Sequence, residues 1–142
     1  MRRRSKGQAL VEFALVVPIV LVIAIATLDM GRVVWAMDSV SNAAREGARL
    51  AVVSASVTAV KENVRQRVRD KAVAAGGSAG LVITVCYGKD CLGDTDTRGA
   101  IPVRGEVVTV RVRTDLDLVA PALFNRTAPF SVTGSSTMIV SN

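Results

Sequence analysis

Histidine is absent from the chain, and cysteine occurs only twice in 142 residues. Histidine is the commonest general base and metal ligand near neutral pH, so its absence removes the usual acid–base enzymes and imidazole metal sites. Two cysteines cannot supply all the ligands of a structural zinc site on their own. The sequence also contains no recognisable nucleophile with its activating partners. It therefore predicts no enzyme, no cofactor and no metal, and a membrane-tethered binding module is one alternative.

Aromatic residues are scarce as well, at 4% of the chain, with one Trp, one Tyr and three Phe. The formal net charge is +6, but Arg2, Arg3, Arg4 and Lys6 all lie within the first seven residues. The rest of the chain holds 14 basic and 12 acidic residues and so carries little excess charge. Nucleic-acid binding normally needs a basic patch on a folded face, together with aromatic platforms. The composition therefore predicts no nucleic-acid partner.

One long apolar run lies between residues 13 and 28, where Thr27 is the only polar side chain. Extended back to Gln8, it has 21 residues with a single charge, Glu12. A membrane-spanning helix needs about 20 residues, and flanking basic residues stay on the cytoplasmic side. The pattern predicts a single span over residues 8–28 in the inner (cytoplasmic) membrane. The N-terminus is expected to be cytoplasmic and the rest of the chain extracytoplasmic.

A secreted protein with an ordinary signal peptide is the alternative, because Ala24-Ile25-Ala26 before Thr27 matches an A-x-A cleavage pattern. Glu12 argues against it, since a carboxylate in the apolar run serves neither a signal peptide nor a plain anchor. An acidic residue at the centre of a membrane helix costs about 2.5–3.5 kcal/mol, and somewhat less near an end. Either Glu12 lies at the level of the lipid headgroups, or it has a charged partner.

Two helices are expected beyond the apolar run. No proline interrupts residues 29–53, so this segment is predicted to continue the membrane helix outside the lipid as one long helix. Residues 54–56 are predicted to break it, and residues 57–72 to form a second amphipathic helix that ends at Gly76-Gly77. Both have an apolar face at steps of three or four residues: Val33, Met37, Val40, Ala44, Ala48 and Ala51 in the first, and Val57, Val60, Val64, Val68 and Ala72 in the second.

After residue 80 the composition changes to the β-branched residues that are typical of strands. Strands are expected over residues 81–87, 106–113 and 130–140, with an irregular loop at residues 90–104. The middle strand alternates valine with threonine or arginine, which predicts an antiparallel sheet with one covered face. The fold class is therefore α+β: a long N-terminal helix, plus a second helix packed on a small antiparallel sheet in an extracytoplasmic domain of residues 54–142.

Four residues, Gly88 among them, separate Cys86 from Cys91, and this spacing suits a hairpin or loop tip closed by a disulfide. An oxidising compartment outside the membrane favours such a bond, which contributes about 2 kcal/mol for so short a loop. A catalytic redox pair more often has two intervening residues near the start of a helix. We therefore expect a structural disulfide between Cys86 and Cys91.

The N-terminal residues resemble the prepilin motif of type IV pilins and their relatives. Gly7 is followed by four residues, then by Glu12, the aromatic Phe13 and an apolar helix. This is the pattern of the Flp/Tad branch. Major Flp pilins usually have Tyr at the position of Phe13, and their chains are much shorter than this one.

Two separated segments carry a closer resemblance to the TadE-like family of minor pseudopilins of the Tad/Flp pilus system. The first is GQALVEFA at residues 7–14, followed by Pro18, and the second is AAREGAR at residues 43–49. The likeness extends over about residues 7–53, the N-terminal third of the chain. The AAREGAR segment is compatible either with plain helix packing and solvated arginines or with binding of a partner.

The resemblance implies a pilin-like fold and a membrane precursor that a prepilin peptidase cleaves between Gly7 and Gln8. Residues 1–7 are then a basic leader. Glu12 and Phe13 are implied to serve assembly, with Glu12 neutralising the N-terminal amine of a neighbouring subunit. The implied partners are membrane lipid, the prepilin peptidase, other pilin-like subunits and the pilus assembly platform. Both incorporation into the pilus and retention at the platform are compatible with the sequence.

Overall fold

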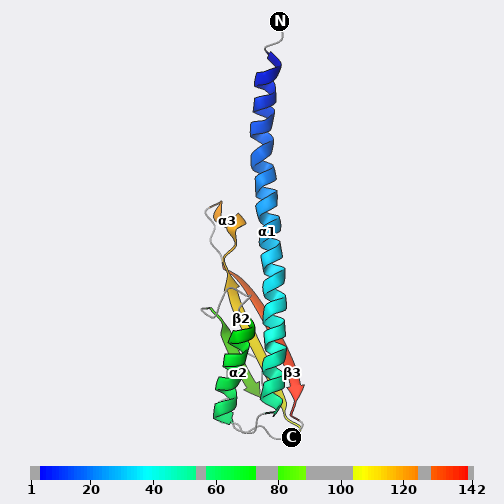
Figure 1. Ribbon diagram of the computed structural model, residues 1–142, viewed down its shortest axis with the longest axis vertical. Helices are drawn as coiled ribbons and strands as arrows, with labels where there is room; N and C mark the ends of the chain where they lie inside the picture. Colours follow the sequence, from blue (N-terminus) through cyan, green and yellow to red (C-terminus); the bar gives the residue numbers. More distant parts are fainter. Residues whose placement is uncertain (1–3, 54–56, 73–79, 89–103, 125–128, 141–142) are drawn as a thin grey trace.

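The computed structural model describes residues 4–53, 57–72, 80–88, 104–124 and 129–140 (Figure 1). Within them both strand pairs are antiparallel, in the order β1-β2-β3. The expected α+β class is confirmed, with a long N-terminal helix, a second helix and a small antiparallel sheet. The elements follow the chain as α1 (Arg4–Val53), α2 (Val57–Lys71), β1 (Val82–Tyr87), β2 (Val107–Leu116), α3 (Val119–Ala122) and β3 (Phe130–Ile139).

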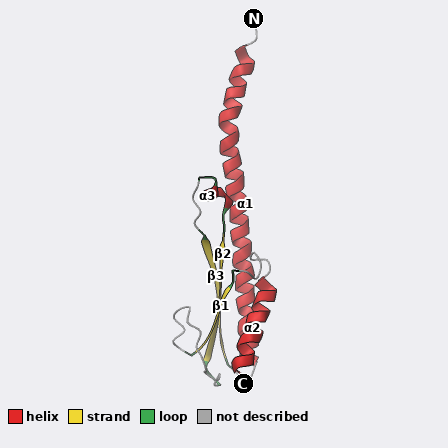
Figure 2. Ribbon diagram, turned by 90° about the vertical axis from the view of Figure 1, so that its left-hand side faces the viewer, coloured by secondary structure: helices red, strands yellow, loops and turns green. Residues whose placement is uncertain are grey.

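Helix α1 is continuous over 50 residues and runs through Pro18 without a break. At a rise of 1.5 Å per residue, a helix of this length extends about 75 Å. Its N-terminal half stands clear of the other elements, whereas its C-terminal half lies along the sheet and α2 (Figures 1 and 2). The prediction of one long helix is confirmed. The break expected at residues 54–56 and the helix end expected at Gly76-Gly77 lie outside the described residues.

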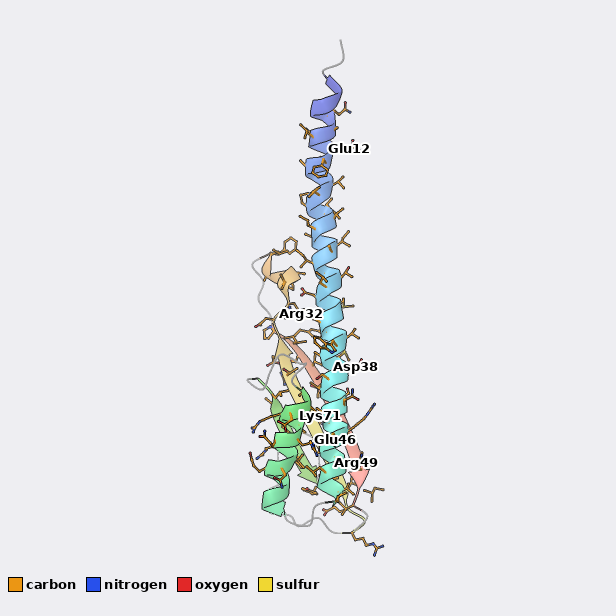
Figure 3. All side chains as sticks on the ribbon, in the orientation of Figure 1. Glu12, Arg32, Asp38, Glu46, Arg49 and Lys71 are labelled. Atoms are coloured by element: carbon orange, nitrogen blue, oxygen red, sulfur yellow. The ribbon has the colours of Figure 1, made fainter. Side chains whose placement is uncertain are left out.

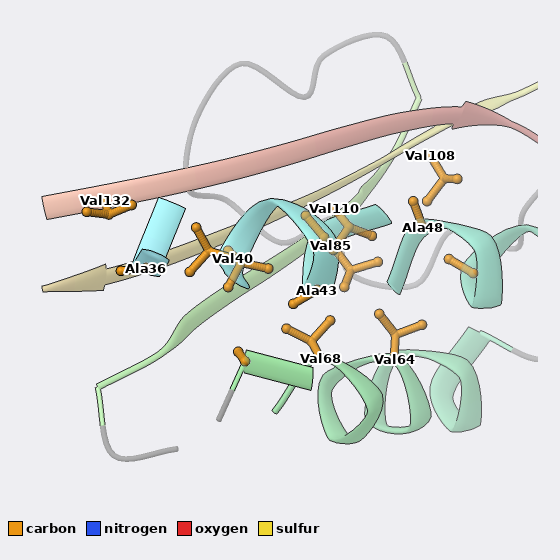
Figure 4. Packing of buried hydrophobic residues seen from close by; sticks show 14 of the residues in the cluster. Ala36, Val40, Ala43, Ala48, Val64, Val68, Val85, Val108, Val110 and Val132 are labelled. Carbon is orange, nitrogen blue, oxygen red and sulfur yellow. The ribbon is translucent and has the colours of Figure 1, made fainter. Parts of the chain in front are cut away.

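The core lies between the C-terminal half of α1, the sheet and α2, and it consists mostly of valine and alanine. Val40 of α1, Val68 of α2, Val85 of β1 and Val110 of β2 are fully buried and gather in one cluster (Figure 4). Small side chains let the elements approach closely, and burial of apolar surface is the main stabilising effect. The buried hydrophobic residues of α1 are Val33, Ala36, Val40, Ala43, Ala44, Ala48 and Ala51.

The apolar face predicted for α1 is wrong at Met37, which is 50% exposed. Ala36 and Ala43, on the other flank of the same stripe, are buried instead. A 3.6-residue period locates the stripe but does not say which flank a neighbouring element will cover. Asp38, next to Met37, lies beyond Lys71, the last residue of α2 (Figure 3). Helix α2 therefore ends before this level of α1.

The apolar face predicted for α2 is confirmed at Val64, Val68 and Ala72, which are fully buried. These three residues follow one another at steps of four and contact the cluster formed by α1 and the sheet. Val57 and Val60 complete the expected face, but they lie outside the residues whose side chains the structure describes.

The three strands form where they were expected, with differences at their ends. β2 continues three residues beyond Arg113 because its alternation persists: Thr114 and Leu116 are buried, and Asp115 lies on the outer face. On that face Arg113 donates a 2.8 Å hydrogen bond to Ser131 Oγ, and Ser131 donates one of 2.6 Å to Asp115 Oδ1. These polar pairs join β2 to β3. β1 and β3 are each one residue shorter than expected, and residues 90–103 of the expected loop lie outside the described residues.

Strand β3 crosses α1 at Gly134, where there is no room for a side chain. A Cβ at this position would lie 2.7 Å from both Ser41 N and Val40 C, and 2.8 Å from Ser41 Cα. All three are backbone atoms of a helix, which cannot move aside individually. Gly134 therefore sets how closely the sheet packs on α1.

Candidate functional site

The described residues contain no group of three His, Cys, Asp or Glu side chains that could hold a metal ion. The features that call for a functional explanation lie along α1 instead. They are its uncovered N-terminal half, its junction with α3, and the charged side chains of residues 43–49.

The N-terminal half of α1 is apolar and is not covered by other described parts of the chain. Its most apolar stretch contains no buried residue, and Leu10, Phe13 and Ile19 are 63–68% exposed. Such a continuous apolar surface is unfavourable in water. Among the described residues, α1 contains the one segment that is long and apolar enough to cross a membrane. This half of the helix therefore supports the expectation of a single-pass membrane protein.

Glu12 carries the only charge between Gly7 and Leu28, and it projects from the uncovered half of α1 (Figure 3). Its carboxylate makes no hydrogen bond or ion pair with any residue whose side chain the structure describes. The adjacent Phe13 is 67% exposed. Within this part of the chain, Glu12 therefore has no counter-charge.

Gly7 has no packing role in the described fold. A Cβ at Gly7 would meet no atom within 4 Å, and its backbone is helical. Glycine inside a helix destabilises it by roughly 0.5–1 kcal/mol relative to alanine. The next residue, Gln8, is exposed in the same helix. Neither residue is required by contacts with the part of the chain that the structure describes, and this leaves both accessible to another protein.

A buried carboxylate lies where the apolar run ends. Asp29 is 6% exposed, and its Oδ2 accepts a 2.7 Å hydrogen bond from the backbone N–H of Ala120 in α3. One turn further on, a guanidinium nitrogen of Arg32 lies 3.6 Å from Asp29 Oδ1 and 3.5 Å from the carbonyl oxygen of Asp117. These polar contacts fasten the chain between β2 and β3 onto α1.

Neither α3 nor its contact with α1 was predicted from the sequence. A helix of four residues is too short to show a hydrophobic period. The hydrogen-bonded pair Asp29 and Ala120 is also separated by 91 residues. The one signal available was the charge of Asp29 directly after the apolar run, a position where an unpaired carboxylate is costly.

The small residues of the AAREGAR segment are explained by packing. Ala43, Ala44, Gly47 and Ala48 are all buried against the sheet and α2. A Cβ at Gly47 would lie 2.7 Å from Cγ2 of Val68, which is itself fully buried. Gly47 therefore allows the two helices to pack closely, as small residues do at helix crossings.

The charged residues of the same segment point outward. Arg45 and Arg49 make no hydrogen bond or ion pair within the described ranges, and Glu46 lies 4.0 Å from Arg67 of α2. Arg45 and Arg49 stand one helical turn apart, where like charges repel each other. Together with Lys71 they line a shallow hollow that Asn42, Glu46 and Met138 complete. Packing therefore explains the small residues of the segment. It does not explain the arginines, which face the solvent.

Cys86 lies in β1, is 3% exposed and is the register partner of Thr109 in β2. Cys91 is outside the described residues, so the Cys86–Cys91 disulfide stays a prediction. Neither cysteine of the exported protein is expected to react with a maleimide under denaturing conditions before reduction, and both are expected to react after it. Mass spectrometry counts the adducts, and two adducts before reduction would contradict the bond.

The arrangement of α1, bare over its N-terminal half and packed against an α+β domain over its C-terminal half, agrees with the pilin-like architecture that the resemblance implies. The family comparison is more specific, because residues 7–49 match the family model described as TadE-like protein. The predicted resemblance is thereby confirmed over these residues. No curated protein and no solved structure matches the chain.

Proposed function

We propose that this protein is a minor pilin-like (pseudopilin) subunit of a Tad/Flp pilus system, with a role in structure and assembly. The observation that carries the proposal is the uncovered apolar half of α1, which holds a single acidic residue, Glu12, five positions after Gly7. The match of residues 7–49 to the TadE-like family supports it.

The subunit is made as a precursor that crosses the inner membrane once. Residues 1–7 form a cytoplasmic leader, whose four basic residues favour that side of the membrane. Residues 8–28 span the lipid, since 21 helical residues extend about 32 Å and the hydrocarbon layer is about 30 Å thick. Residues 29–53 continue the helix outside and carry the domain of residues 54–142.

Cleavage between Gly7 and Gln8 by a prepilin peptidase produces a positive charge that can pair with the carboxylate of Glu12. The cut removes four basic residues and creates an α-amino group on Gln8, which is positive at neutral pH for an ordinary α-amine. A carboxylate in a low-dielectric environment is stabilised by such a partner and costly without one. Glu12 of one subunit is therefore proposed to pair with the Gln8 amine of a neighbour within the lipid or the filament, with Phe13 packed beside it.

The test is the N-terminus of the protein recovered from membranes of cells that contain a prepilin peptidase. The wild-type chain is expected to begin at Gln8. A Gly7→Leu variant is expected to accumulate as uncleaved precursor, because a bulky side chain replaces the glycine at the cleavage site. The fold tolerates this change, since a Cβ at Gly7 meets nothing within 4 Å. Intact mass measurement distinguishes the two forms.

Gly31→Leu is the matched control, because Gly31 is also a helical residue of α1 with nothing within 4 Å of its Cβ position. This variant is expected to be cleaved normally. A wild-type chain that begins at Thr27 would instead support the secreted protein, although that cut falls inside continuous α1, where Thr27 Oγ1 donates to the Ile23 carbonyl at 2.8 Å. An intact Met1 on the wild-type chain would contradict cleavage.

A further inference from the structure

The connection between β2 and β3 exposes large apolar side chains at the end of the folded domain nearest the N-terminal half of α1 (Figures 1 and 2). Val119 is 46% exposed, Leu123 55% and Phe124 67%, and α3 contains no buried residue. Burial in the core therefore does not explain why this short segment is apolar. The side chains of Val119, Leu123 and Phe124 are exposed, whereas Leu118 is partly buried against the core.

Three backbone N–H groups of the same segment have partners within the chain. The N–H of Leu123 bonds to the carbonyl of Val119 at 3.3 Å, and the N–H of Phe124 bonds to that of Pro121 at 3.0 Å. The N–H of Ala120 bonds to the carboxylate of Asp29 at 2.7 Å. Backbone groups that enter a lipid environment must already have partners. The N–H groups of Ala120, Leu123 and Phe124 meet this requirement.

The position of this tip relative to the membrane follows from the proposed function, on which the present inference rests. If residues 8–28 span the lipid, Asp29 lies at the outer surface of the membrane. Asp29 is the residue that α3 covers, so α3 lies at that same level. Near the same level of α1, Leu28 is 70% exposed, Met30 67% and Trp35 63%. Exposed apolar side chains of α1 and of α3 therefore lie close to the same level along the α1 axis, and tryptophan is a typical residue of the membrane interface.

We infer that residues 117–124 form a membrane-docking foot, with the side chains of Leu123 and Phe124 inserted in the outer boundary of the lipid next to α1. The lipid surface is the occupant because the apolar surface of the foot continues that of the spanning helix. The contacts from Ala120 and Arg32 supply the polar partners of Asp29, so that its carboxylate is shielded at this boundary. Interfacial segments of this kind enter the headgroup and acyl boundary to a depth of about 5–10 Å.

The experiment places a single tryptophan in the full-length chain, reconstituted in phosphatidylcholine and phosphatidylglycerol vesicles whose acyl chains carry bromine. Trp35→Phe provides the background without tryptophan. Phe124→Trp then reports on the foot, and Phe13→Trp reports on the spanning segment. Val53→Trp is the exposed control at the far end of α1, where Val53 is 68% exposed. Bromine quenches tryptophan fluorescence only at short range.

Trp at position 124 is expected to be quenched by brominated lipid several-fold more than Trp at position 53, and to be protected from acrylamide in the water. Quenching at position 13 without quenching at position 124 would overturn the foot and leave the membrane span intact. Absence of quenching at position 13 would instead overturn the span itself. Protection of position 124 that appears only when other pilus subunits are reconstituted as well would assign this surface to a protein neighbour and contradict the foot.

Discussion

Replacement of Glu12 by alanine is expected to abolish pilus assembly while leaving membrane insertion and cleavage after Gly7 intact. Removal of a carboxylate from an apolar helix makes insertion easier. The same change leaves the Gln8 amine of a neighbouring subunit without a partner in a low-dielectric environment. Breaking a buried ion pair costs enough to weaken an association by about a hundredfold or more. The measurements are pilus formation and co-purification of partner subunits with the variant.

Two further variants locate the cause of the assembly defect. Asp38→Ala removes an exposed acidic residue of α1 beyond the lipid, and it is expected to assemble normally. Gly7→Leu keeps the carboxylate but prevents formation of the amine, so it is expected to reproduce the defect of Glu12→Ala. Normal assembly by Glu12→Ala would show that Glu12 is only a carboxylate at the headgroup level. Cleavage between Gly7 and Gln8 is a separate claim and would survive that result.

A Gly134→Ala substitution is expected to destabilise the folded domain by about 3 kcal/mol, because the added methyl group meets backbone atoms of α1 at 2.7 Å. The helix cannot yield locally, so β3 has to move away and open gaps in the surrounding valine cluster. A loss of this size corresponds to a fall in Tm on the order of 10 °C. Circular dichroism of the full-length protein in detergent, followed during heating, measures it.

Gly80→Ala is the control for this substitution, since a Cβ at Gly80 meets nothing within 4 Å and Gly80 has no positive φ. Its stability is expected to stay within about 0.5 kcal/mol of the wild type. If Gly134→Ala unfolds at the temperature of Gly80→Ala, the sheet is free to move relative to α1. The close contact would then not limit stability.

Repeating patterns in the sequence were sufficient to predict the main elements. The steps of three and four residues from Val33 to Ala51 and from Val64 to Ala72 located the packed faces of both helices, and the alternation from Val108 onward located β2. Met37 was assigned wrongly because a period does not say which flank of a helix its neighbours cover. The contact of Gly134 with Ser41 could not be predicted, since it joins residues far apart in the chain.

In the proposed site, too, some features could be predicted from the sequence and others depend on tertiary contacts. Glu12 could be singled out because a carboxylate in an apolar run is costly in lipid, whereas Gly7 and Phe13 were identified through the resemblance to the prepilin motif. The role of Asp29 as a partner of α3 depends on a tertiary contact with Ala120, which no local pattern reveals. In the AAREGAR segment the small residues are packed and the arginines face the solvent. This difference likewise could not be predicted without the positions of α2 and the sheet.

The lengthwise contact of α1 with β3 has a mechanical consequence. The two elements contact each other over much of the domain, most closely where Gly134 meets the backbone of Ser41 (Figure 1). A pull along the axis of α1 therefore loads these contacts all at once in shear, instead of peeling them apart one after another. The domain can then stay attached to the helix under tension that would separate an element held at one end only.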